Sequence, residues 1–171
     1  MRFILLFLLS IPALADVTGV VVGVADGDTV TVLDAAMTQH KVRVAGIDAP
    51  EKAQPFGQRA RQRMSTLVFG KEVRLEGDKR DRYGRTVSKI WVSPPDCPRC
   101  PKTLDAGLAV LTSGLAWHYK KYQNEQSNEA GERYAFAENE ARSKRAGLWT
   151  EADPVPPWEW RKSRRSVNGR P

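Results

Sequence analysis

Carboxylates and arginines gather in three short segments of this 171-residue chain. The carboxylates are Asp28, on an Asp-Gly turn, and Asp48 and Glu51, three residues apart; the arginines are Arg43 and Arg85. Carboxylate oxygens are the ligands that hard cations such as Ca²⁺ prefer, a further carboxylate serves as a general base, and the planar arginine fork donates two hydrogen bonds to phosphate oxygens. The set predicts hydrolysis of a phosphodiester, with the cation at Asp28 and Asp48.

Each of these segments also has an ordinary structural explanation. Asp-Gly is most often a hairpin turn, the segment from Asp48 to Glu51 reads as a strand exit closed by Pro50, and arginines commonly lie on the solvated side of a strand. The presence of all three segments in one chain, in order, favours catalysis. His118 is expected to be packed or at the surface, because no serine or cysteine nucleophile with its own motif accompanies it.

Alternating polar and apolar residues predict a small β-barrel that would bring these segments together. A helix with a basic outer face is expected over residues 54–69, where Phe56, Ala60, Met64 and Leu67 recur at helical spacing and Gly70 ends the pattern. Two more helices are expected, one opening at residue 103 and one over residues 128–146. The predicted fold is α+β, a five-stranded Greek-key barrel of the OB type with about three helices. Its strands are expected at residues 17–24, 29–33, 39–47, 71–77 and 85–92.

In its motifs the chain resembles the staphylococcal nuclease (thermonuclease) family. The matching pieces are ADGDTVTV at residues 25–32, RVAGIDAPE at 43–51 and DRYGR at 81–85. The later GLAWHYKKY at 114–122 and AGLW at 146–149 are similar to the helical part of that family. The resemblance covers roughly residues 17–160, and the combination is specific although each piece alone is weak.

The resemblance implies an enzyme that hydrolyses both DNA and RNA with the help of Ca²⁺. Two departures stand out: Ala49 replaces a threonine of the best-known member, and the family pattern lacks the CPRC segment at residues 97–100. The resemblance implies calcium ligands at Asp28 and Asp48, a water-activating role for Glu51, phosphate contacts from Arg43 and Arg85, a basic residue near the terminal phosphate at Arg82, and nucleotide contacts from Tyr83 and Tyr119.

The overall composition supports a folded protein with a polyanionic partner. There are 27 Lys and Arg against 20 Asp and Glu, a formal net charge of +7, and 41% of the residues are hydrophobic, which excludes a fully disordered chain. Two other functions remain possible for such a protein. One is a catalytically silent OB module that binds nucleic acid, and the other is a module that attaches to a membrane surface or cell wall. The first would have lost several of the five catalytic and metal residues, and the second rests on charge alone.

The ends of the chain differ in composition from its centre. Residues 1–15 read as a secretory signal peptide, with Arg2 before an apolar run and with Ala13 and Ala15 at the −3 and −1 positions. Cleavage is expected after Ala15, giving a monomeric periplasmic or secreted protein without integral membrane association. The expected division is a signal peptide over 1–15, a nuclease-like domain over 16–160, and a basic, disordered tail over 161–171, where non-specific phosphate binding is a secondary role.

Cys97 and Cys100 lie in the proline-rich CPRC segment. In an oxidising compartment, the simplest interpretation is a local disulfide that stiffens a loop. A thioredoxin-like redox pair would need the motif to open a helix after a strand, and a zinc site would have only His40 and His118 to complete it. A structural bridge is therefore expected.

Overall fold

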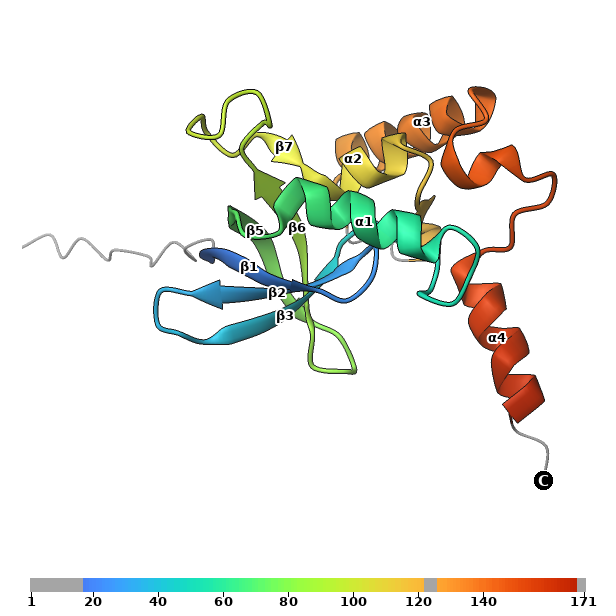
Figure 1. Cartoon of the computed structure of the whole chain (residues 1–171), viewed down its shortest axis with the longest axis horizontal. Helices are drawn as coiled ribbons and strands as arrows, with labels where there is room; N and C mark the ends of the chain where they lie inside the picture. The colour runs from blue at the N-terminus through green and yellow to red at the C-terminus, as the bar shows by residue number, and fades with distance from the viewer. Residues whose placement is uncertain (1–16, 122–125, 169–171) are drawn as a thin grey trace, which may run out of the picture.

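The computed structural model describes residues 17–121 and 126–168, so the predicted signal peptide lies outside the described residues. Its main sheet has the strand order β3-β2-β1-β5-β6-β7, and a parallel pairing of β3 with β6 closes it into a barrel (Figure 1). The predicted α+β barrel is confirmed. The five barrel strands are β1 (Thr18–Val24), β2 (Thr29–Asp34), β3 (Gln39–Val44), β5 (Glu72–Arg80) and β6 (Thr86–Val92).

Strict alternation builds the barrel interior. Val30 on β2 lies opposite Val42 on β3, and both are buried, while the next pair along the strands, Thr31 and Lys41, turns outward. The pairing of β1 with β2 shifts register between Val21 and Gly23, next to the turn that carries Asp28. Such a bulge bends the strand at the barrel rim and re-aims the residues that follow.

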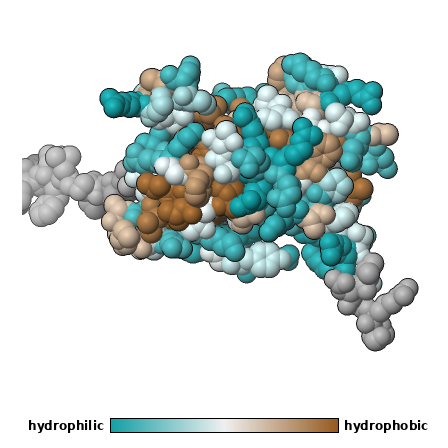
Figure 2. Space-filling model, in the orientation of Figure 1, coloured by the Kyte–Doolittle hydropathy of each residue, from teal (hydrophilic) through white to brown (hydrophobic). Residues whose placement is uncertain are grey.

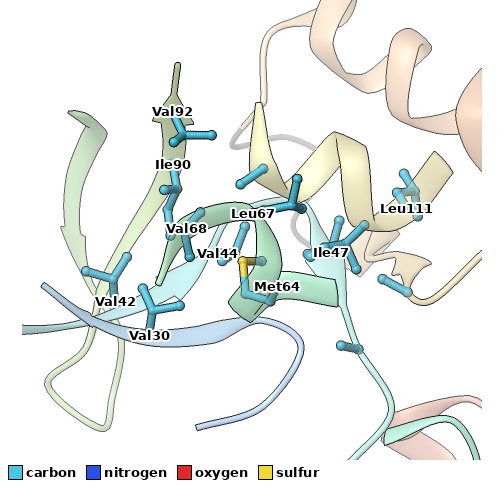
Figure 3. Close-up of a cluster of buried hydrophobic side chains, with 14 of the residues drawn as sticks. Val30, Val42, Val44, Ile47, Met64, Leu67, Val68, Ile90, Val92 and Leu111 are labelled. Atoms are coloured by element: carbon cyan, nitrogen blue, oxygen red, sulfur yellow. The ribbon is translucent and has the colours of Figure 1, made fainter. Parts of the chain in front are cut away.

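Helix α1 (Gly57–Val68) closes one end of the barrel (Figure 1). Its buried side chains Met64, Leu67 and Val68 enter the same core as Val44 and Ile90 from the strands (Figure 3). Gly70 follows in the left-handed region, at φ +71°, and its N–H donates to the Val21 carbonyl at 2.9 Å. Glycine adopts this conformation without steric cost, so the predicted helix end is correct.

The remaining elements form a helical layer beside the barrel. Helix α2 (Ala106–Thr112) follows the short strand β7 (Leu104–Asp105), and Asp105 caps it by accepting from the Leu108 N–H at 3.1 Å. Helix α3 (Asn128–Ser143) packs on α2 and places the Tyr134 hydroxyl 2.8 Å from Asp105 Oδ2. The 3-10 helix η2 (Gly147–Thr150) then leads towards the C-terminal part.

A second, two-stranded sheet joins this layer to the barrel. It pairs β4 (Ile47–Asp48) with β8 (Trp117–His118), so that Asp48 lies opposite Trp117. His118 is buried, its backbone N–H donates to Glu138 Oε1, and its Nε2 lies 3.0 Å from Gln126 Oε1. The expectation of a packed histidine is confirmed, and this packing fixes the strand that holds Asp48.

The prediction of a disordered tail from residue 161 is wrong as far as residue 168. Helix α4 spans Pro157–Asn168, which brings the α-helices in the described part of the chain to four where about three were expected, and it starts inside the segment assigned to the domain. Proline at the first helical position is pre-organised for a helix, and Pro157 is buried. Trp158 packs edge-on against Trp117, with ring centroids 5.6 Å apart. Tertiary contact therefore orders a segment whose composition alone argues for disorder.

The structure joins Cys97 and Cys100 in a disulfide, the pairing expected from the sequence. The bridge lies in the loop between β6 and β7, whose residues do not line the large cleft described below. The view in Figure 2 is largely hydrophilic, apart from an apolar patch over β1, where Val20 and Val22 are exposed. Within the described ranges, no helix is long and apolar enough to span a bilayer.

Candidate functional site

A single cleft of about 1000 Å³ collects every residue that the sequence assigned to substrate, metal or catalysis. Its walls are the open end of the barrel, the β5–β6 hairpin and the C-terminal helix α4, and the latter two project on the same side of the molecule in Figure 1. The predicted residues that line it are Asp28, Arg43, Asp48, Glu51, Arg82, Tyr83, Arg85 and Tyr119.

The strand register places Asp28 beside Arg43. Arg43 on β3 pairs with Thr29 on β2, and the Val44 N–H donates to the Asp28 carbonyl at 2.8 Å. Asp28 ends a turn in which its own N–H donates to Asp26 Oδ1 at 3.0 Å, the arrangement that Asx residues favour. The turn is therefore more than a hairpin connection, because it presents a buried carboxylate to the next strand.

The Arg43 guanidinium lies between the two predicted metal-binding carboxylates. Its Nη1 is 3.2 Å from Asp28 Oδ2, and its Nη2 is 3.0 Å from Asp48 Oδ1. Nη1 also donates to the carbonyls of Val44 and Ile47. Burial alone would lower the pKa of Arg43, but the nearby carboxylates Asp28 and Asp48 raise it above its ordinary value. Arg43 thus compensates buried negative charge besides facing the cleft.

The backbone of Ala49 supports Asp28 from the other side. Its N–H donates to Asp28 Oδ2 at 2.6 Å, while Thr29 Oγ1 donates to Oδ1. This contact uses no side-chain atom, so the alanine that departs from the family pattern keeps it. Asp26, next to this pair, has its pKa raised to about 7, first because burial disfavours its charge and then because Asp28 repels it.

Glu51 lines the cleft and is hydrogen-bonded to an arginine of α4. Its Oε1 accepts from Nη1 of Arg161, on α4, at 2.7 Å, and Nη2 of the same guanidinium donates to Asp48 Oδ2 at 2.7 Å. Burial lowers the pKa of Arg161, but hydrogen bonds to Asp48 and Glu51 raise it above its ordinary value. Sequence reasoning missed this residue because it assigned residue 161 to the tail. The helix signal was present, with prolines 156 and 157 at the start and Glu159 in the first turn.

The β5–β6 hairpin presents a stacked group of two arginines and a tyrosine. Arg82 and Arg85 both lie over the Tyr83 ring, at 4.8 and 5.5 Å from its centroid, and Tyr83 is 67% exposed. Asp81 holds the turn: its Oδ1 accepts from the Tyr83 and Arg85 N–H groups, and its Oδ2 accepts from Arg85 Nε at 2.7 Å. These bonds overcome the effect of burial and lower the pKa of Asp81.

Tyr119 lines the cleft from another part of the chain. It follows β8, its N–H donates to the Gly46 carbonyl at 2.9 Å, and its ring lies 5.8 Å from that of Trp158. The two predicted nucleotide-contacting tyrosines therefore line the cleft from different elements, Tyr83 from the hairpin and Tyr119 from the segment after β8.

The donor set at the centre fits a hard cation. Asp28 and Asp48 are buried, and Asp48 Oδ2 and Glu51 Oε1 already converge on one positive group, the Arg161 guanidinium. Among residues 17–121 and 126–168, no three His, Cys, Asp or Glu side chains form a cluster that could hold a metal ion. Backbone carbonyls or water would therefore have to complete the coordination that Ca²⁺ requires.

Comparison with known proteins agrees with the fold. The family model described as "Staphylococcal nuclease homologue" matches residues 41–151. A micrococcal nuclease of Shigella flexneri is 39% identical over 161 residues, covering 94% of this chain and 89% of that protein. An uncharacterized endonuclease of Escherichia coli O157:H7 is 38% identical over 159 residues, covering 92% and 94%. Protein ParB of Escherichia coli is 40% identical over 151 residues, covering 88% and 82%. The chain belongs to the staphylococcal nuclease family of hydrolases.

Proposed function

We propose that this nuclease is an exported, Ca²⁺-dependent enzyme that hydrolyses the phosphodiester bonds of DNA and RNA without selecting the sugar, and that it acts as a monomer. The observation that supports this most is the convergence of Asp28, Arg43, Asp48, Glu51 and Arg85 on one cleft, from segments far apart in the chain. Metal dependence is general in the family. Low specificity follows because arginines that contact phosphate carry no sequence information.

In the proposed mechanism, Asp28 and Asp48 would hold Ca²⁺, which would supply positive charge to the scissile phosphate. The Glu51 carboxylate takes the proton of the attacking water, and it is partly exposed at the cleft, where water reaches it. Arg85 presents its guanidinium to the phosphate oxygens as negative charge builds up on them. Arg43 is the second phosphate contact, and it also forms ion pairs with both aspartates and holds them in place.

The hairpin and the helical layer position the nucleic acid. Tyr83 offers an exposed ring face to a base or sugar, and the two guanidinium groups stacked on it face the phosphates. Arg82, whose Nη2 donates to the Tyr83 hydroxyl at 2.7 Å, is held on the cleft wall. Tyr119 bounds the bound nucleotide on the other side.

Removal of metal tests the calcium requirement. A chelator is expected to abolish cleavage of single-stranded DNA, duplex DNA and RNA, and added Ca²⁺ to restore it, measured as substrate loss on gels. Asp28→Asn, which preserves the shape of the side chain, is expected to raise the Ca²⁺ concentration needed for half-maximal rate and to lower the maximal rate. Exposed Asp96→Asn, in the disulfide loop, is the matched control and should behave like the wild type. Undiminished cleavage in chelator would overturn the assignment.

Export is tested by the mass of the protein recovered from the cell envelope or medium. The alanines at positions 13 and 15 after the apolar run predict cleavage by signal peptidase, so the mature chain should begin at Asp16. Intact-mass measurement reads this directly. Replacing Ala13 by a bulky residue should block processing, because the −3 and −1 positions accept small side chains. Recovery of the full-length chain as the soluble exported form would contradict the proposal.

A further inference from the structure

Helix α4 brings a positive charge to the oxygens that the proposed reaction uses. Arg161 bridges the predicted metal ligand Asp48 and the predicted base Glu51, with one nitrogen 2.7 Å from each carboxylate and a third contact of 3.3 Å to Asp48 Oδ1. Asp48 is only 1% exposed, whereas Arg161 is 33% exposed and reaches in from the side of the cleft. The Arg161 guanidinium is therefore part of the site, although none of the sequence motifs that resemble the nuclease family includes it.

The first turn of α4 is anchored firmly enough to keep Arg161 in range. The Trp158 ring packs against Trp117 and Tyr119, with centroids 5.6 and 5.8 Å apart, and the Gln54 side-chain amide donates to the Val155 carbonyl just before the helix. Beyond Arg161 the helix is exposed from Lys162 to Ser166. It is therefore held at one end, and the Arg161 contacts are the polar bonds that tie it to the carboxylate centre.

These contacts compete with the chemistry proposed for the same oxygens. The Asp48 carboxylate accepts one charge-assisted hydrogen bond from Arg161 on each oxygen, at 2.7 Å on Oδ2 and 3.3 Å on Oδ1, so it has little capacity left for a divalent cation. Two positive groups at one carboxylate also repel each other. A Glu51 oxygen that accepts a hydrogen bond from Arg161 also has less capacity to accept one from the attacking water. Arg43 donates to Asp48 Oδ1, which accepts only the longer bond from Arg161, and Arg43 is fixed by two backbone carbonyls. The short bond to Asp48 Oδ2 comes from Arg161, which is therefore the group that competes with a cation.

We infer that α4 guards the cation site: Arg161 occupies it in the metal-free enzyme, and Ca²⁺ binding requires the guanidinium to leave Asp48 and Glu51. The inference rests on the proposed Ca²⁺ dependence, which it deepens by adding a competitor within the chain. The displaced Arg161 stays on the wall of the substrate cleft, where Arg165 also lies. A polyanion in the cleft would then hold α4 in the displaced position, so nucleic acid and Ca²⁺ should favour each other's binding.

The first test measures Ca²⁺ affinity by isothermal titration calorimetry, without nucleic acid, on the purified chain. Arg161→Gln should bind Ca²⁺ about tenfold more tightly than the wild type, the gain expected when a competing state populated about ten to one is removed. Lys162→Gln removes the same charge from the next residue, which is exposed, and should match the wild type. Thermal unfolding of each variant establishes that it is folded.

The second test separates displacement from a simple change in local charge. Amide hydrogen exchange over residues 158–166 should become faster when Ca²⁺ is added to the wild type, because the helix loses its bonds to the carboxylates. In Arg161→Gln the exchange should already be fast and should not respond to Ca²⁺. Equal Ca²⁺ affinity of the wild type and Arg161→Gln, or exchange in the wild type that ignores Ca²⁺, would overturn the inference and leave the proposed function intact. Failure of all variants to bind Ca²⁺ would instead overturn the proposed cofactor, and the inference with it.

Discussion

Replacing Glu51 by glutamine is expected to lower the rate of cleavage by a factor of about 10²–10⁴, the range typical for loss of a general base. Glutamine has the same shape, but its amide oxygen does not accept the proton of the attacking water at neutral pH. Affinity for the nucleic acid should change little, because it depends mainly on Lys and Arg contacts to phosphate. Glu51 adds a negative charge to the cleft, so its removal does not weaken that attraction.

The measurement is single-turnover cleavage of a labelled oligonucleotide, beside a binding titration at the same salt concentration. Glu51 also accepts a hydrogen bond from Arg161, so the wild type and Glu51→Gln are compared at saturating Ca²⁺. Glu132→Gln removes the same charge from an exposed position on α3 and should cut like the wild type. Wild-type cleavage by Glu51→Gln would refute the assignment of the base. If the wild type binds tightly but does not cut in the presence of any divalent metal, the protein is the silent binding module that the sequence left open.

The barrel and most of the site are predictable from the sequence because their signals are local. A few neighbouring residues are enough to predict each of these elements: the strands from their period of two, the end of α1 from its glycine, and the turn from its Asp-Gly pair. The pairing of β3 with β6 closes the barrel, and the ends of the strands that carry the site residues therefore lie at one rim. Asp28, Arg43 and Asp48 consequently lie together as the motifs suggested.

The role of α4 is not predictable in the same way. Its composition is that of a disordered basic segment, and its order depends on contacts with residues such as Trp117 and Asp48, far away in the sequence. Likewise, the position of Arg43 in its sequence motif does not reveal that its guanidinium contacts two buried aspartates and a backbone carbonyl of the following segment. Both features depend on long-range contacts, which a motif does not encode.

Arg43 and Arg85, the two arginines proposed to contact phosphate, differ in burial, and this makes Arg85 the informative one to remove. Arg43→Ala would leave the buried Asp28 without its counter-charge and Asp48 with Arg161 alone, and removing one partner of a buried ion pair typically destabilises a protein by about 3–5 kcal/mol. Any loss of activity would then be mixed with loss of fold. Arg85 is partly exposed, and its partner Asp81 is also reached by solvent. Its removal therefore leaves no buried charge unpaired.

Arg85→Ala is expected to lower the single-turnover rate by about 10²–10³, the cost of losing one donor aimed at charge that develops in the transition state. Binding should weaken much less, because the ground-state phosphate keeps its other cationic contacts. Arg99→Ala, which removes an exposed charge from the disulfide loop, is the control for net charge and should match the wild type. Arg85→Lys should recover only part of the rate, since a single ammonium group lacks the two-pronged geometry of guanidinium. If Arg85→Ala weakens binding and rate by the same factor, Arg85 holds the substrate without stabilising the transition state, and the catalytic assignment is wrong.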